Sequence, residues 1–191
     1  MEELLILVNE NDEVIGFKEK METHIKEKLH RAFSLFIFDK DNKKMLIHKR
    51  ADGKYHSGGL WTNSCCSHPR KGEDLQTAVV RRTKQELGLD LTEKQLEFDK
   101  TGSYEQGLHE LGSFKYYKKF PKCAEYEIDH VFYLPLHTNE ISLNLDVDEI
   151  SEAMWISVDE LKKWLNSSPE TFTAWFPKAL DFVLKNVFGD S

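Results

Sequence analysis

The stretch "SHPRKGEDLQTAVVRRTKQELGLD", residues 67–90, carries the strongest helical pattern in the first half of the chain. Its apolar residues recur at the spacing that places side chains on one face of an α-helix; they are Leu75, Ala78, Val79 and Leu87. Acidic residues 73 and 74 lie at the start of the predicted helix, where negative charge interacts favourably with the positive end of the helix dipole. Gly88 follows the last turn, and helices commonly end at such a glycine. The pattern predicts an amphipathic helix that begins at residue 73.

Strands and further helices are predicted on both sides of this helix. Short apolar runs between polar turns indicate strands at residues 4–8, 14–18, 31–38, 45–50, 113–120, 125–136 and 152–157. A short helix is predicted after Thr92, another from the capping box of Ser157 and Glu160, and a last one over residues 174–188. The order predicts an α/β or α+β sandwich with an N-terminal strand hairpin and a C-terminal helix. No linker divides it, so we expect one domain over residues 1–191.

Composition excludes several classes of partner. With 26 Lys and Arg against 33 Asp and Glu, the net charge of -7 argues against nucleic acid or an anionic membrane as a ligand bound through bulk electrostatics. No apolar run approaches the roughly 18 residues of a membrane span, and the first twenty residues do not resemble a signal peptide. We therefore expect a cytoplasmic protein whose three cysteines are reduced.

Histidines and glutamates suggest a metal site. Glu125 and Glu127 lie two apart in a predicted strand, so their carboxylates would point to the same side, and adjacent anions repel unless a cation lies between them. The same spacing also fits an ordinary solvent-facing strand, and no familiar metal-ligand spacing involves His24, His30 or His68. Spacing leaves both readings open. A site of this mixed composition suits Mg2+, Mn2+ or Zn2+.

The segment "TNSCCSHP", residues 62–69, places two adjacent thiols beside a histidine. Adjacent cysteines form a disulfide only with strain, which argues against a redox pair. If His68 is cationic or binds a metal nearby, the pKa of the Cys66 thiol falls, and the thiol can serve as nucleophile, acid or base. A buried, inert thiol is the other reading for Cys66. One of the two side chains must point away from any site, and we expect that to be Cys65.

The opening stretch resembles the Nudix box, G-x5-E-x7-R-E-U-x-E-E-x-G-U, where U is aliphatic. Five residues match it: Glu73, Arg81, Glu86, Gly88 and Leu89. Four depart from it: Ser67, Arg82, Thr83 and Gln85. The resemblance implies an α/β fold in which a mixed sheet is sandwiched by helices. A diphosphate hydrolase needs this helix to hold several metals, so the loss of two carboxylates argues against hydrolysis.

The chain resembles one branch of this superfamily more closely, the type 1 isopentenyl diphosphate isomerases. Its segments occur here in the family's order over roughly residues 24–176: "HRAFSLFIF", "MLIHKR", "WTNSCCSHP", the modified box ending in "ELG", "FKYY", "EYEIDHVF" and "TAWF". The resemblance implies an enzyme of isoprenoid biosynthesis. It would move a double bond between isopentenyl and dimethylallyl diphosphate, adding a proton at one carbon and removing one at another.

The resemblance also implies the metal sites. One divalent cation, Mn2+, Mg2+ or Zn2+, would be held by His24, His30, His68, Glu125 and Glu127. Mg2+ associated with the substrate diphosphate would be held partly by Glu86 and by the backbone carbonyl of Cys66. Basic residues that match those near the phosphates in the family are Arg50, Lys54 and Arg82.

Catalytic roles follow from the same resemblance. Cys66 and Glu127 would flank the substrate as an acid-base pair, Tyr116 would assist proton transfer at the carboxylate, and Trp175 would stabilise a tertiary carbocation with its aromatic face. The alternative function is a Nudix pyrophosphohydrolase of a nucleoside or prenyl diphosphate, which would want glutamates at positions 82 and 85. A binding module without catalysis would have no reason to combine these four side chains. The expected partner is a small prenyl diphosphate, with no nucleic acid and no membrane.

Overall fold

The computed structural model describes residues 3–99 and 102–189. Within them, one mixed sheet contains the strands β1 (Leu4–Val8), β2 (Val14–Glu19), β3 (His30–Asp39), β4 (Lys44–Arg50), β5 (Trp61–Thr62), β6 (Cys65–Ser67), β7 (His109–Lys119), β8 (Ala124–Leu136) and β9 (Ile150–Ser157). The helices are α1 (Lys20–Ile25), α2 (Leu75–Leu87), α3 (Glu93–Leu96), α4 (Val158–Ser167) and α5 (Phe176–Val187), with short 3-10 helices η1 (Thr138–Glu140) and η2 (Pro169–Thr171).

Strand β3 is the centre of the sheet. One of its edges pairs with β8 in parallel along the whole strand, from His30 opposite Glu127 to Asp39 opposite Leu136. Its other edge is shared in turn by β1, β6 and β4, all antiparallel. Almost every residue of β3 and β8 is buried, as expected for strands that are covered on both faces. The two edges of β3 therefore bring distant segments to the same place.

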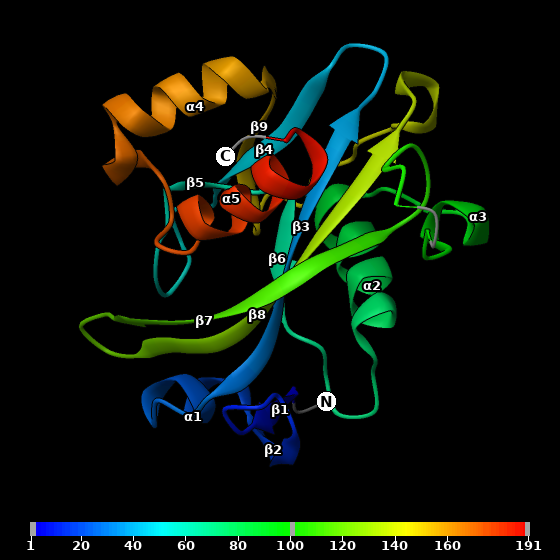
Figure 1. Ribbon diagram of the computed structural model, residues 1–191. Helices are drawn as coiled ribbons and strands as arrows, with labels where there is room; N and C mark the ends of the chain where they lie inside the picture. Colours follow the sequence, from blue (N-terminus) through cyan, green and yellow to red (C-terminus); the bar gives the residue numbers. More distant parts are fainter. Residues whose placement is uncertain (1–2, 100–101, 190–191) are drawn as a thin grey trace.

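Alternating side chains of the central strands enter two separate cores. Phe36 and Phe38 of β3 pack with α5 and with Leu161 of α4, whereas Leu35 and Ile37 pack with the apolar face of α2. Figure 1 shows α2 on one face of the sheet and α5 on the other, with α4 beyond α5. The predicted fold, a mixed sheet sandwiched by helices, is confirmed.

The capping residues at its two ends determine where helix α2 begins and ends. The side chain of Asp74 accepts a hydrogen bond from the Thr77 amide at 2.7 Å and caps the helix, so Glu73 stands just outside it. Gly88 ends the helix with a φ of +64°, and a β-carbon there would lie 2.5 Å from the Asn144 carbonyl oxygen. The helix that the sequence predicts is confirmed, but it begins two residues later than expected.

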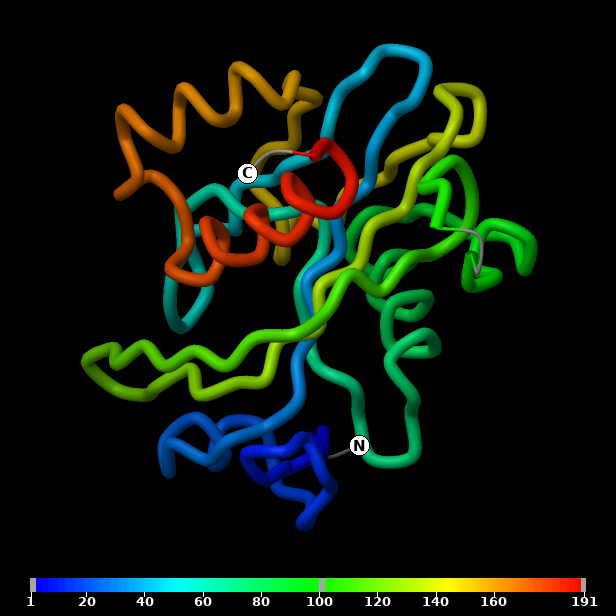
Figure 2. The backbone as a smooth tube through the Cα atoms, viewed as in Figure 1, coloured from blue at the N-terminus to red at the C-terminus, as the bar shows by residue number. Residues whose placement is uncertain are grey.

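Helix α1, which packs beside the predicted strands β1 and β2 at one end of the molecule, was not predicted. Helix α1 follows β2 directly, because the Glu19 carboxylate accepts hydrogen bonds from the amides of Met21 and Glu22. Figure 2 shows β1, β2 and α1 gathered beneath the hairpin of β7 and β8, which projects from the sheet. Strand β7 begins at His109, four residues before the predicted strand. None of the described helices is long and apolar enough to cross a membrane.

Candidate active site

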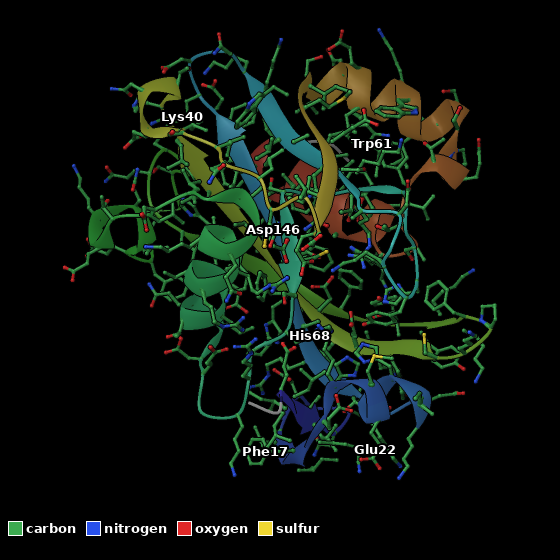
Figure 3. All side chains as sticks on the ribbon, turned by 180° about the vertical axis from the view of Figure 1, so that it is seen from behind. Phe17, Glu22, Lys40, Trp61, His68 and Asp146 are labelled. Carbon is green, nitrogen blue, oxygen red and sulfur yellow. The ribbon has the colours of Figure 1, made fainter. Side chains whose placement is uncertain are left out.

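Five histidine and glutamate side chains converge from four segments of the chain. His24 comes from α1, His30 from the start of β3, His68 from the residue after β6, and Glu125 and Glu127 from β8. One ligand atom from each lies within 4.8 Å of all the others, and all five residues are buried. Figure 3 shows His68 between the central sheet and the N-terminal elements. The solvent-facing interpretation of Glu125 and Glu127 is therefore wrong, because both carboxylates are buried against histidines from other segments of the chain.

Backbone carbonyls orient two of the histidines. His24 Nδ1 lies 2.6 Å from the Lys20 carbonyl oxygen and His30 Nδ1 lies 2.8 Å from that of Lys28, so each Nδ1 donates and each Nε2 keeps its lone pair. His30 Nε2 is buried and makes no hydrogen bond, although it lies 3.3 Å from the Glu127 carboxylate. A buried acceptor without a donor, facing carboxylates, fits a divalent cation.

Burial and mutual repulsion control protonation in this cluster. Burial, with repulsion from the other histidines, lowers the pKa of His30 to about 4 and holds the pKa of His68 well below its usual range. Burial raises the pKa of Glu127, and repulsion from Glu125 raises it further. Burial also opposes ionisation of Glu125, but hydrogen bonds, the largest of them from Glu127, together outweigh it and lower the pKa of Glu125. The lowered pKa values of His30 and His68 favour neutral imidazoles there, and the carboxyl proton of the Glu125 and Glu127 pair can be exchanged for a metal ion.

A pocket of about 530 Å3, partly open to solvent, adjoins the cluster. Every predicted site residue lines it except His24 and His30, which reach the cluster from outside the pocket.

The side chains of Cys65 and Cys66 point to opposite faces of strand β6. Cys66 lines the pocket, whereas Cys65 is fully buried in the core beside α2, with its Sγ 3.6 Å from a Glu86 carboxylate oxygen. Burial raises the pKa of the Cys66 thiol to about 12, although the Arg50 guanidinium, 3.9 Å from Sγ, acts in the opposite direction. The expectation that Cys65 points away from the pocket is confirmed.

Aromatic residues form the wall next to the carboxylates. Tyr116 is partly buried, and its hydroxyl lies 3.3 Å from a Glu125 oxygen, whereas Tyr117 is exposed on the other face of β7 and bonds Glu27. The Trp175 indole is buried and donates to Asn63 at 3.3 Å. The strand alternation thus selects Tyr116 from the pair of tyrosines.

Basic residues gather at the other end of the pocket, each beside an acidic group. Arg82 pairs with Glu86, its neighbour one turn along α2, and lies 3.4 Å from Glu149. Lys54 pairs with Glu149 as well. Burial raises the pKa of the Glu86 carboxyl, although Arg82 lowers it. This end combines cations with carboxylates, as a site for a metal-bound phosphate would.

The remaining box residues hold a loop. Arg81 binds both oxygens of Glu73, at 2.6 and 2.8 Å, and also donates to the His68 carbonyl at 3.2 Å. This bidentate pair ties the segment that carries His68 to α2, so its role is to position the cluster.

Sequence reasoning did not assign nine of the residues that line the pocket: Lys20, Ala32, Phe33, Ser34, Tyr55, His56, Ser67, Asp129 and Glu149. Asp129 could have been predicted from the sequence, because it follows Glu127 by two residues and therefore lies on the same face of the strand. It accepts a hydrogen bond from Ser34 at 2.8 Å, its other oxygen makes none, and burial raises its pKa to about 7. The others had no local signal, because they reach the pocket from separate elements, among them β3, α1 and the loop between β4 and β5.

Comparison with known proteins gives the family. Residues 28–176 match the NUDIX domain. The Isopentenyl-diphosphate Delta-isomerase 2 of Photorhabdus laumondii is 41% identical over 182 residues, which are 95% of this chain and 92% of that protein. A protein of the same name from Aromatoleum aromaticum is 40% identical, over 96% of this chain and 88% of its own length. This chain belongs to the isopentenyl-diphosphate Delta-isomerase family of NUDIX proteins.

Solved structures support the fold of this isomerase-family chain. The DR0079 protein of Deinococcus radiodurans aligns with a TM-score of 0.65 at 19% identity, covering 86% of this chain and 90% of that one. The MutT protein of Methanosarcina mazei aligns with a TM-score of 0.58 at 18% identity, covering 83% and 96%. At these identities the likeness concerns the fold alone.

Proposed function

We propose that the chain interconverts isopentenyl diphosphate and dimethylallyl diphosphate, in line with the names of its relatives. The reaction adds a proton to one carbon of the alkene and removes one from another, through a tertiary carbocation. This activity belongs to isoprenoid biosynthesis, and its substrate is a small prenyl diphosphate. The expected cytoplasmic location stays a prediction.

One observation carries the proposal: the Cys66 thiol and the Glu127 carboxylate line the same pocket from opposite sides of β3. Strands β6 and β8 are both direct neighbours of β3, so the two strands run about 10 Å apart. Cys66 lies opposite Ser34 and Glu127 opposite His30, so the two side chains face each other diagonally across β3. A five-carbon chain that lies above Ala32 and Ser34 of β3 would have a proton-carrying group on each side. Cys66 and Glu127 then act as the acid-base pair, and they exchange roles when the reaction runs backwards.

The surroundings of the pair suit carbocation chemistry. Protonation of an unactivated alkene gives a cation that water would trap, so the site must exclude water. Buried Trp175 lines the pocket and offers an aromatic face, which would stabilise a desolvated cation by about 2 kcal/mol. Tyr116, 3.3 Å from Glu125, stands beside the carboxylates and can assist proton transfer there.

We assign a resident divalent metal, Mn2+, Mg2+ or Zn2+, to the cluster of His24, His30, His68, Glu125 and Glu127. When bound, such a cation supplies positive charge that lowers the pKa of a carboxyl group it contacts. The unpartnered His30 Nε2 and the paired buried carboxylates support this assignment.

We assign the diphosphate to the basic end of the pocket. Arg50, Lys54 and Arg82 supply cationic groups in a protein whose net charge is -7. Substrate-associated Mg2+ would be held by the Glu86 carboxylate and the Cys66 carbonyl. Mg2+ commonly combines one or two carboxylates with phosphate oxygens, which this end of the pocket can supply.

The hydrolase alternative lacks its carboxylates. Position 82 carries an arginine that pairs with Glu86, and Gln85 at the other position is exposed. Incubation with isopentenyl diphosphate and Mg2+ in heavy water separates the two functions. Deuterium in a dimethylallyl product supports the isomerase, whereas release of phosphate or pyrophosphate without that product contradicts it.

A further inference from the structure

His56 lies beside the metal cluster without belonging to it. It stands in the loop between β4 and β5, and only 7% of its surface is exposed. Its ring centroid lies 6.4 Å from that of His24, whereas those of His30 and His68 lie 4.8 and 5.4 Å away. It supplies none of the five ligand atoms that lie within 4.8 Å of one another. Figures 1 and 2 show this loop reaching toward the hairpin of β7 and β8.

Both nitrogens of His56 have partners. Nε2 contacts Glu125 Oε1, the same oxygen that His24 Nε2 approaches at 3.4 Å. Nδ1 lies 3.1 Å from the Ser57 hydroxyl. If the hydroxyl donates to Nδ1, the ring proton resides on Nε2, which then donates to the carboxylate.

The ring itself is held from two sides. It stacks on Phe120, the residue that follows β7 in the hairpin turn, at 4.7 Å and 25°, and Tyr55 meets it edge-on at 4.5 Å. The loop backbone is equally constrained. A β-carbon at Gly58 would lie 2.7 Å from the Asp52 carbonyl oxygen, so only glycine fits this approach. His56 is thus a rigid link between the loop and the start of β8.

We propose that His56 is a positioning residue whose Nε2-H group holds the Glu125 carboxylate in the orientation that binds the metal. Glu125 then has one anchor on each oxygen, His56 on Oε1 and Tyr116 on Oε2 at 3.3 Å. A carboxylate has about four lone-pair directions, so two anchors leave lone pairs for the cluster. Donors of this kind to a ligand are typically worth about 10- to 100-fold in metal affinity. The proposal rests on the assignment of a metal to the cluster.

Two substitutions separate the donor from the ring. His56→Phe keeps an aromatic ring against Phe120 and removes the donor, whereas His56→Gln removes the ring and keeps an N-H group near the Nε2 position. The measurement is the affinity of metal-stripped protein for Mn2+ by calorimetry, in the absence of diphosphate. We expect His56→Phe to bind Mn2+ about 10- to 100-fold more weakly than the unsubstituted chain, and His56→Gln to recover most of the loss.

His109→Phe is the matched control, because His109 is a buried histidine outside the pocket, bonded to the Gln106 carbonyl. It should bind Mn2+ as the unsubstituted chain does; an equal loss there would show that the effect of His56 is not local. Unchanged affinity in His56→Phe overturns the proposal. An equal loss in His56→Gln also overturns it, since the imidazole would then be a ligand itself.

Ser57→Ala covers the case in which His56→Phe does not fold. It removes only the hydroxyl that directs the His56 proton, and it should weaken Mn2+ binding in the same direction by a smaller factor. Unchanged affinity in Ser57→Ala would count against the proposal. Failure of the metal assignment is a separate result: the unsubstituted chain would then bind no Mn2+, Zn2+ or Mg2+.

Discussion

Replacement of Trp175 by leucine tests whether an aromatic face stabilises a cation in this pocket. The ring is buried and lines the pocket, and the Arg50 guanidinium carbon already lies 5.5 Å from its centroid, so a cation fits on this ring. A desolvated cation-π contact is worth about 2 kcal/mol. At about 1.4 kcal/mol for each factor of ten, its loss should lower kcat by about 30-fold. Trp175→Phe keeps a weaker aromatic face and should lose less.

The assay is kcat at saturating isopentenyl diphosphate, measured well below the Tm of each variant. This precaution matters because both changes also remove the hydrogen bond from the indole to Asn63 and leave space in a packed core. Mn2+ affinity serves as the control. Among the described residues, the Trp175 indole donates to Asn63 and to none of the five side chains of the metal cluster. Equal kcat values for the leucine and phenylalanine variants would refute the cation-π reasoning, because only one of them retains an aromatic ring.

Three other predictions concern the thiols, the metal and pH. Cys66→Ala should lower turnover by at least about 100-fold in the isomerase assay, whereas Cys65→Ala should leave it nearly unchanged; an equal loss in both would mean that the wrong thiol was chosen. Mn2+ at about 100 times its Kd should raise the Tm of the metal-stripped chain by about 5–10 °C in a thermal melt, and a Tm independent of metal would contradict the cluster assignment. Burial lowers the pKa of His48 from 6.5 to about 4. Between pH 6.5 and pH 4 the unfolded chain therefore binds a proton at His48 and the folded chain does not. The free energy of unfolding falls as the pH drops through this range, by about 2 kcal/mol at pH 5. His48→Asn keeps a donor to the Ser64 carbonyl and should remove that part of the pH dependence in urea titrations at pH 7 and 5; an unchanged dependence would contradict it.

Local features of the fold could be predicted because they depend on residues within one or two turns. The Ser157 and Glu160 capping box begins α4, Thr92 caps α3, and Asp74 and Gly88 bound α2. Helix α1 was missed because its cap is a glutamate, an uncommon choice, and it is only six residues long. Strands β5 and β6 were missed because strands of two and three residues depend on their partners rather than on their own pattern.

The sequence by itself determined which chemical groups this chain has available: the altered box, the paired thiols, and the glutamates two apart on a strand. Those motifs are contiguous, so they can be recognised before the chain folds. Only the tertiary structure decided how the groups are used. The register of β6 against β3 turned Cys66 to the pocket and Cys65 to the core. The pairing of β3 with β8, together with α1, gathered five histidine and glutamate side chains from positions between 24 and 127, and a loop brought His56 to Glu125. Such contacts follow from strand register and loop closure over long separations, which neighbouring residues do not specify.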